Sequence, residues 1–157
     1  MKGGLGATLV AAAMLAGCAS AKGYPEVRPP NLQIRTETSP TQVRAEIHIH
    51  RVDADCRTQY EGTVLLDRPV VELGVPAGRT SVVAVTFSTS SMLGGSRSSV
   101  RYATLLTPRA GHRYDVKVTY RDNLYDVVIR ESDPRGSSSR QLARRDPAQC
   151  KGLLSSQ

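Results

Sequence analysis

The stretch VRAEIHIHRV, Val43 to Val52, decides the fold because apolar and polar side chains alternate along most of its length. An alternation with a period of two is typical of a strand with one buried face, whereas an amphipathic helix repeats about every 3.6 residues. One face carries the apolar members and the other the polar ones: Val43, Ala45, Ile47 and Ile49 against Arg44, Glu46, His48 and His50. We therefore predict a half-buried β-strand here.

Short stretches of similar composition follow, separated by turn residues. They span Tyr60–Leu66, Val70–Val75, Arg79–Ser88 and Ser99–Thr107. Turns are expected at Pro76-Ala77-Gly78 and Pro108–Gly111, because Pro presets φ and Gly accepts positive φ, and a Ser/Gly-rich loop is expected between them at 88–99. A helical period is visible only over Arg140–Arg145, which is long enough for one turn. About seven short strands joined in this way predict an all-β chain folded as a single antiparallel β-sandwich.

The last two strands allow a test of register. A three-residue loop between them would place Asp126 beside Val118. A four-residue loop, Arg121 to Leu124, instead matches like with like: Tyr120 with Tyr125, Val118 with Val127 and Val116 with Ile129. A slip of one residue turns every side chain to the other face, so we predict the four-residue loop.

Two turn motifs in this region resemble those of a known class of module. VELGVPAGRTSVVAVTF, Val71 to Phe87, is a strand, a Pro-x-Gly turn and a strand, and LLTPRAGHRYDVKVTY, Leu105 to Tyr120, repeats the plan with a Tyr-containing strand. Together they resemble the PEGA-like and transthyretin-like β-sandwich modules of exported bacterial proteins, over about Glu72 to Arg130. The resemblance implies an Ig/transthyretin-like sandwich that serves as an accessory or interaction domain, with no catalytic residues to transfer.

The first residues have the pattern of an export signal. Lys2 is followed by GLGATLVAAAMLAGC, Gly4 to Cys18, in which small apolar residues predominate. A bilayer-spanning helix needs roughly 20 apolar residues, so this run is too short to be one. It also lacks the amphipathic period of a core helix, and it precedes a polar, Pro-rich segment. A positive start, an apolar middle and small residues at the exit predict a signal peptide.

Leu15-Ala16-Gly17-Cys18 resembles the lipobox of bacterial lipoproteins. The resemblance implies that Met1–Gly17 is removed and that Cys18 becomes an N-terminus carrying a diacylglycerol thioether and usually three acyl chains in all. Two or more chains give stable anchoring. In the family's common sorting rule an Asp after the Cys retains the protein at the inner membrane. Ala19 stands there, which implies the outer membrane, with the domain facing the periplasm.

The prolines and polar residues suggest the domain boundaries. Pro25, Pro29, Pro30 and Pro40 lie in a segment with few large apolar residues, so residues 18–41 are expected to be a disordered tether, with at most a short edge strand at Leu32 and Ile34. The β-sandwich is then expected over 42–132. Residues 133–157 are expected to form a polar, Ser- and Arg-rich tail.

If Cys18 carries lipid, Cys56 and Cys150 remain. An isolated pair in an oxidising periplasm favours a disulfide, which would hold the tail against the domain. Two buried free thiols are the alternative.

The chain is basic, with a net charge of +7, most of it from arginine. A basic cytosolic protein would suggest nucleic acid as a partner, but export excludes it. The anions that remain are lipopolysaccharide phosphates, lipid headgroups, cell-wall polymers and acidic envelope proteins. We favour the alternative that the arginines mainly solvate the outer strand faces.

His48 and His50 point the same way, two residues apart on one strand. Such a pair could share a metal ion with Asp53, Asp55 or His112. We favour a polar, solvent-facing row instead, and expect no cofactor.

The serines do not indicate a nucleophile. LGGSRSS, Leu93 to Ser99, is not a nucleophile elbow, and paired carboxylates, phosphate loops and Cys-x-x-Cys are absent from the sequence. We therefore expect no enzyme, but a membrane-anchored periplasmic lipoprotein that acts as a binding or structural module. A metal-binding lipoprotein using His48 and His50 is the first alternative, and an unrecognised hydrolase is the second.

Overall fold

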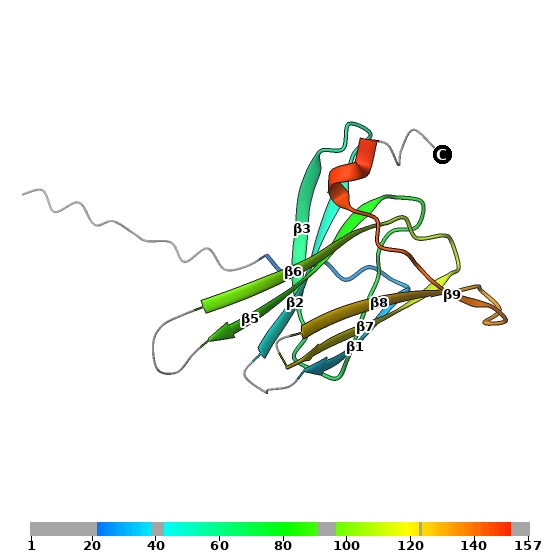
Figure 1. Cartoon of the computed structure of the whole chain (residues 1–157). Helices are drawn as coiled ribbons and strands as arrows, with labels where there is room; N and C mark the ends of the chain where they lie inside the picture. The colour runs from blue at the N-terminus through cyan, green and yellow to red at the C-terminus, as the bar shows by residue number, and fades with distance from the viewer. Residues whose placement is uncertain (1–21, 39–42, 91–96, 123, 152–157) are drawn as a thin grey trace, which may run out of the picture.

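The computed structural model describes residues 22–38, 43–90, 97–122 and 124–151 (Figure 1). Over these ranges the chain forms nine strands and one turn of 3₁₀ helix, Pro147–Gln149. A five-stranded sheet has the order β4 (Val70–Leu73), β1 (Leu32–Thr38), β7 (Arg113–Arg121), β8 (Leu124–Ser132) and β9 (Ser139–Gln141). A four-stranded sheet has the order β3 (Thr58–Leu65), β2 (Val43–Val52), β5 (Ser81–Ser90) and β6 (Arg97–Leu106). The predicted all-β sandwich is confirmed.

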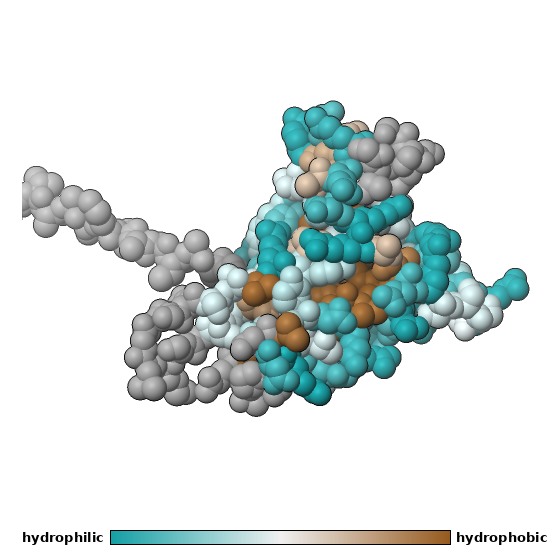
Figure 2. Space-filling view, viewed as in Figure 1, coloured by the Kyte–Doolittle hydropathy of each residue, from teal (hydrophilic) through white to brown (hydrophobic). Residues whose placement is uncertain are grey.

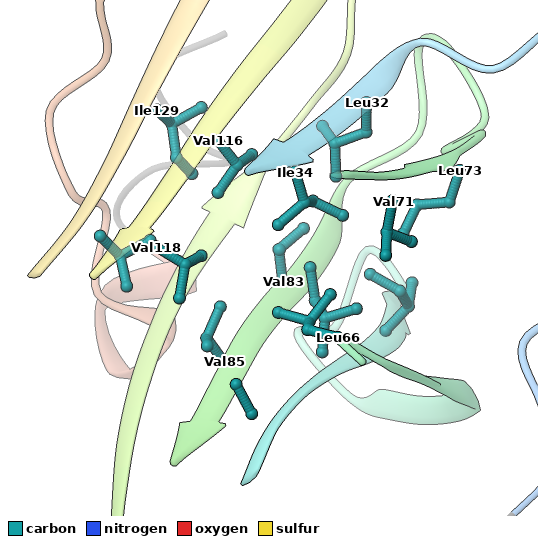
Figure 3. Packing of buried hydrophobic residues seen from close by; sticks show 14 of the residues in the cluster. Leu32, Ile34, Leu66, Val71, Leu73, Val83, Val85, Val116, Val118 and Ile129 are labelled. Carbon is teal, nitrogen blue, oxygen red and sulfur yellow. The ribbon is translucent and has the colours of Figure 1, made fainter. Parts of the chain in front are cut away.

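The core lies between the two sheets and is built from alternate residues of the strands. Val43, Ala45, Ile47 and Ile49 of β2 are at most 8% exposed, as their alternation predicted. Figure 3 shows Ile34, Val116 and Val118 of one sheet facing Val83 and Val85 of the other. Of the described helical segments, none has the length and hydropathy needed to cross a bilayer.

The predicted register of the last hairpin is confirmed. Tyr120 pairs with Tyr125, Val118 with Val127 and Val116 with Ile129. Pairing continues to Arg121 and Leu124, so the connection is tighter than the expected four residues. Asp122 has a positive φ of 53°, a conformation that Asp tolerates better than most residues in hairpin turns.

The expectation of a tether over 18–41 was wrong for its described part. β1 lies inside the five-stranded sheet, antiparallel to β4 and parallel to β7, so the sandwich is not purely antiparallel. Leu32 and Ile34 are 1% and 0% exposed. Asn31 supports this position because its side-chain amide exchanges two hydrogen bonds of 2.8 Å with the backbone of Val75.

The residues before β1 also belong to the sandwich. The Tyr24 amide donates to the Thr63 carbonyl at 3.1 Å, and the Thr63 amide donates to the Lys22 carbonyl at 2.9 Å. Gly74 allows a close approach, since a Cβ there would lie 2.2 Å from the Val27 carbonyl oxygen. Prolines suit an extended segment packed on a sheet as well as they suit a linker, which is why composition misled the prediction.

The polar tail expected from residue 133 is held by more than its disulfide and is part of the sandwich over the described residues. β9 adds to β8, and the one helical turn is at Pro147–Gln149 rather than at Arg140–Arg145. Residues 142–150, here called the strap, cross from β8 of one sheet to β6 of the other. The Leu142 amide donates to the Ile129 carbonyl, and the Leu105 amide donates to the Arg145 carbonyl, both at 2.8 Å. The polar tail therefore closes part of the open side of the sandwich.

Candidate binding cleft

A cleft of about 460 Å³ opens between the two sheets where the strap bridges them. Its volume falls in the range of small-molecule sites, about 300–1,000 Å³. The lining comes from β6, the loop after it, β7, β8, β9 and the strap. The side chains used below are Tyr102, Leu106, Arg109, Ile129, Glu131, Arg140, Leu142 and Arg145.

The floor of the cleft is apolar. Leu106 and Ile129 are each 4% exposed and belong to the main core, while Tyr102 and Leu142 are partly buried and pack against it. Figure 2 shows a hydrophobic area between β6 and β8, bordered by hydrophilic side chains. An apolar ligand group placed here would cover the parts of Tyr102 and Leu142 that remain accessible to water.

A buried carboxylate stands at one end of this floor. Glu131 is 5% exposed, and its two oxygens are divided between different donors. Oε1 accepts the Tyr114 hydroxyl at 2.8 Å, and Oε2 accepts Arg140 Nε at 2.7 Å and the Arg109 guanidinium at 3.2 Å. The His112 ring adds Nδ1 at 3.5 Å from Oε1. The negative charge of Glu131 is therefore compensated by donors from the protein itself.

The protonation states of this cluster are held fixed. Burial opposes ionisation of Glu131, but the hydrogen bonds from Tyr114 and Arg140 and the charges of Arg109 and Arg140 outweigh it, so the pKa of Glu131 lies below its ordinary value. Burial is also the main reason why the pKa of Tyr114 rises to about 12. Near neutral pH the carboxylate is charged and the phenol is neutral.

Positive charge dominates the mouth. The side chains of Arg109 and Arg140 are 53% and 62% exposed, although both contact Glu131. Arg145, an exposed residue of the strap, also lines the cleft, and its backbone amide donates to Thr104 Oγ1 at 2.9 Å. Arg144 lies over the Tyr102 ring, 5.3 Å from its centre. Three arginines against one carboxylate leave a positive surplus along the lining.

Sequence reasoning missed this cluster although one signal was present. Along β8 the inward series runs Val127, Ile129, Glu131, so a carboxylate occupies a position where the alternation calls for an apolar residue. The general expectation that arginines solvate the outer faces does not describe Arg109 and Arg140, which share one buried acid.

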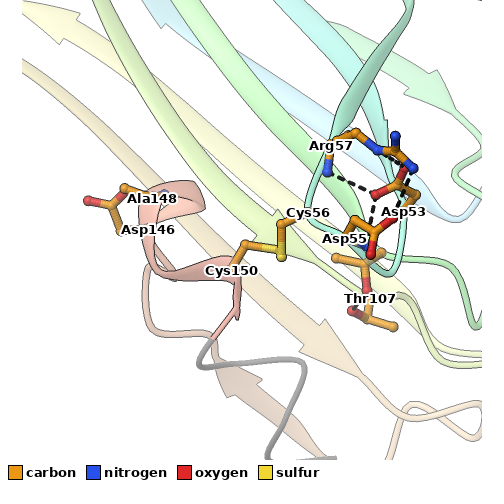
Figure 4. Close-up of a disulfide and its surroundings, with 9 residues drawn as sticks. Asp53, Asp55, Cys56, Arg57, Thr107, Asp146, Ala148 and Cys150 are labelled. Atoms are coloured by element: carbon orange, nitrogen blue, oxygen red, sulfur yellow. Dashed lines mark hydrogen bonds and ion pairs between the residues drawn. A yellow bond between two sulfur atoms is a disulfide. The ribbon is translucent and has the colours of Figure 1, made fainter.

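The predicted disulfide is present (Figure 4). Cys56 and Cys150 are bonded across a sequence separation of 94 residues. Cys150 is 4% exposed and joins a second small cluster with Val82 and Leu105 on the outer face of the four-stranded sheet. The bond therefore fastens the end of the strap. Cys18, the predicted lipidation site, lies outside the described residues.

His48 and His50 do point to the same outer face, but other groups engage them. His48 Nδ1 lies 2.7 Å from Thr63 Oγ1, and the His50 ring lies 5.3 Å from the Tyr60 ring. Burial is the main cause that lowers the pKa of both imidazoles, and the nearby charge of Arg101 lowers it further.

The residues expected to complete a metal site are occupied elsewhere. Asp53 and Asp55 pair with Arg57, and His112 lies beside Glu131. Within the part of the chain that the structure describes, no three His, Cys, Asp or Glu side chains are grouped to hold a metal ion. The arrangement gives the metal-binding alternative no support.

Comparison with known proteins bears on the fold alone. No family model matches the chain, and no curated protein does. Among solved structures, sea bream transthyretin in complex with thyroxine aligns at 10% identity and a TM-score of 0.43, over 63% of this chain and 93% of that one. Transthyretin from Sparus aurata aligns at 11% identity and a TM-score of 0.42, over 72% and 98%. Nothing about a ligand follows from so distant a likeness.

Proposed function

We propose that this protein is a lipid-anchored, non-catalytic binding module of a bacterial envelope, which holds an anionic envelope component at the arginine-rimmed cleft. The observation that carries the proposal is the arrangement around Glu131. The carboxylate holds Arg109 and Arg140 while both side chains remain more than half exposed. A guanidinium has five N–H donors, so each retains donors for a ligand. Donors held in place before binding lose less entropy on binding.

A binding role fits the protonation states better than a catalytic one. General acid–base catalysis is most effective when the pKa of the group lies near the working pH. Here the pKa of Glu131 is lowered and that of Tyr114 is raised to about 12, so both move away from neutrality. The cluster maintains charge instead of exchanging protons.

The position of Lys22, the first described residue, indicates which side of the domain a lipid on Cys18 would hold near the membrane. Lys22 is already bonded to Thr63 at the outer edge of β3. The four steps from Cys18 to Lys22 span at most about 14 Å at roughly 3.5 Å per residue. β3 and β6 are opposite edges of their sheet, so an anchor beside β3 leaves the cleft beside β6 at the far edge. A partner would then approach from the aqueous side.

The anchor is tested by the intact mass and membrane fractionation of the wild type and a Cys18→Ser variant. We expect acyl chains on the wild type and release of the variant from the membrane. A wild type without acyl chains would remove the anchor from the proposal.

Binding is tested by titrating the isotope-labelled protein with defined envelope anions: lipopolysaccharide core oligosaccharide, glycerophosphate headgroups and acidic cell-wall fragments. We expect at least one to shift the backbone resonances of Leu142 and Arg145, and Arg140→Gln to weaken that binding about tenfold. Arg121→Gln, at the far end of β7, is the charge-matched control. If no anion perturbs these resonances, the proposed binding role is wrong.

A further inference from the structure

The cleft combines an anion-attracting rim with an apolar floor, and this combination narrows the class of ligand. We infer that the cleft binds a small single-headed amphiphile, a carboxylate or monoalkyl phosphate with an apolar body. The head lies at Arg140 and Arg145, and the body lies on Tyr102, Leu106, Ile129 and Leu142. This inference rests on the proposed function and specifies its ligand.

The head position follows from which polar groups are still available. Glu131 accepts from Tyr114 on one oxygen and from two arginines on the other, so its capacity to receive a ligand donor is largely used. Arg145 differs from its neighbours, because its side chain makes no hydrogen bond or ion pair within the described residues, while its backbone is fixed to Leu105 and Thr104. A ligand that supplies acceptors is therefore favoured over one that supplies donors or positive charge.

The body position follows from the core. β6 alternates, so Tyr102, Thr104 and Leu106 face the space between the sheets, while Leu105 faces the outer cluster with Cys150. Opposite them, Ile129 comes from β8, one inward position before Glu131. Leu142 closes this side from the strap and is tied to β8 through the Ile129 carbonyl. The apolar lining and the charged rim are thus adjacent in the cleft. A ligand whose anionic head is joined to an apolar body would contact both at once.

One head is favoured because the positive surplus is local. Of the three arginines that line the cleft, Arg109 and Arg140 contact its single carboxylate, Glu131, and Arg145 lies where the strap meets β6. A ligand charged along its whole length would place anionic groups on Ile129 and Leu106, each 4% exposed, which would cost desolvation without a partner.

The test is a titration of the full chain carrying Cys18→Ser, so that neither acyl chains nor detergent compete. The probes are butanoate, hexanoate, octanoate and octyl phosphate, with acetate, inorganic phosphate and octanol as controls, all below the concentration of micelle formation. Affinity is expected to rise about fourfold for each added CH₂, which corresponds to about 0.8 kcal/mol per buried CH₂. Octanol, which lacks the anionic head, is expected to bind at least tenfold more weakly than octanoate.

Variants locate the two parts of the site. Arg145→Gln is expected to weaken octanoate and octyl phosphate about tenfold, and Leu142→Ala is expected to flatten the dependence on chain length. Arg121→Gln removes the same charge at a distance and should change neither. Thermal unfolding of each variant, followed by circular dichroism, shows whether the fold is kept. If Leu142→Ala unfolds, Leu142→Met, which keeps the apolar contact, should retain the chain-length dependence.

The outcomes separate the inference from the proposed function. If acetate and inorganic phosphate bind as tightly as octanoate and octyl phosphate, the amphiphile is wrong and a simple anion site remains. If octanol binds as tightly as octanoate, or if Arg121→Gln weakens binding as much as Arg145→Gln, the assigned head position is wrong. If no anion binds, with or without a chain, both the inference and the proposed binding role fail. A preference between octanoate and octyl phosphate identifies the head.

Discussion

The Tyr114 hydroxyl offers a direct test of the buried cluster at the cleft. Tyr114→Phe removes one oxygen and keeps the ring in the core, where Tyr114 is 1% exposed. The oxygen donates to Glu131 Oε1 at 2.8 Å and accepts the Arg109 amide at 2.8 Å. The variant therefore leaves a buried carboxylate oxygen short of a donor and a backbone amide short of an acceptor.

The expected loss of unfolding free energy is the sum of the contributions of these two hydrogen bonds. A hydrogen bond to a charged group is worth about 1.5–3 kcal/mol and a neutral one about 0.5–1.5 kcal/mol, so we expect a destabilisation of about 2–4.5 kcal/mol. For a domain of this size, a change of that order lowers the melting temperature by about 10 °C. Urea unfolding at neutral pH, followed by circular dichroism, measures the free energy directly.

The effect of Tyr114→Phe on the free energy of unfolding should also depend on pH, in a direction set by Glu131. The pKa of Glu131 is lowered by folding, so its contribution to stability is present above 4.5, its ordinary value, and is lost as pH falls through the lower pKa of the folded state. The Tyr114 hydroxyl is one cause of that lowering. The difference between wild type and Tyr114→Phe should therefore be largest near neutral pH and shrink below about pH 4.5.

Tyr125→Phe is the matched control, because Tyr125 is 38% exposed and its ring packs against Phe87. Its hydroxyl makes no hydrogen bond within the described residues, so a change of less than about 0.5 kcal/mol is expected. The reasoning is refuted if Tyr114→Phe is as mild as this control, or if its effect is unchanged between pH 7 and pH 3.

Three further perturbations test the disulfide, the turn at Asp133 and the segment before β1. Replacing Cys56 and Cys150 by serine should lower the free energy of unfolding by up to about 4–5 kcal/mol, because the disulfide closes a long loop; urea unfolding with no change would contradict this. Hydrogen bonds from the serines that follow it lower the pKa of Asp133 to about 2, so stability should decline as pH falls from 3.8 toward 2. An Asp133→Asn variant should lack that part of the acid transition in a pH titration of unfolding, and an unchanged transition would show that the turn contributes nothing. Gly74→Ala places a Cβ 2.2 Å from the Val27 carbonyl oxygen, so it should destabilise the protein by roughly 1–3 kcal/mol and speed hydrogen exchange in the segment before β1. Exchange as slow as in the wild type would mean that this segment is not packed as described.

The candidate site was the part least accessible to sequence reasoning. The arginines were visible as charge, and Glu131 was visible as a carboxylate that continues the inward face of β8. Its partners were not, because Arg109 stands 22 residues before it and Tyr114 stands 17 residues before it. An alternating pattern says which way a side chain points, but not which side chains from other strands it meets.

The sequence by itself determined the class of fold, the inward face of strands such as Val43–Val52 and the register of the last hairpin. Period two and turn chemistry are local, and a slip of one residue would expose a whole face. Only the tertiary structure decided which strands lie side by side and which side chains from different strands meet. It placed β1 between β4 and β7, carried the polar strap across to β6 and brought Glu131 among its donors. These contacts join residues far apart in the chain, and they are decided by which pairings bury the core and satisfy the backbone together, a condition that no single segment expresses.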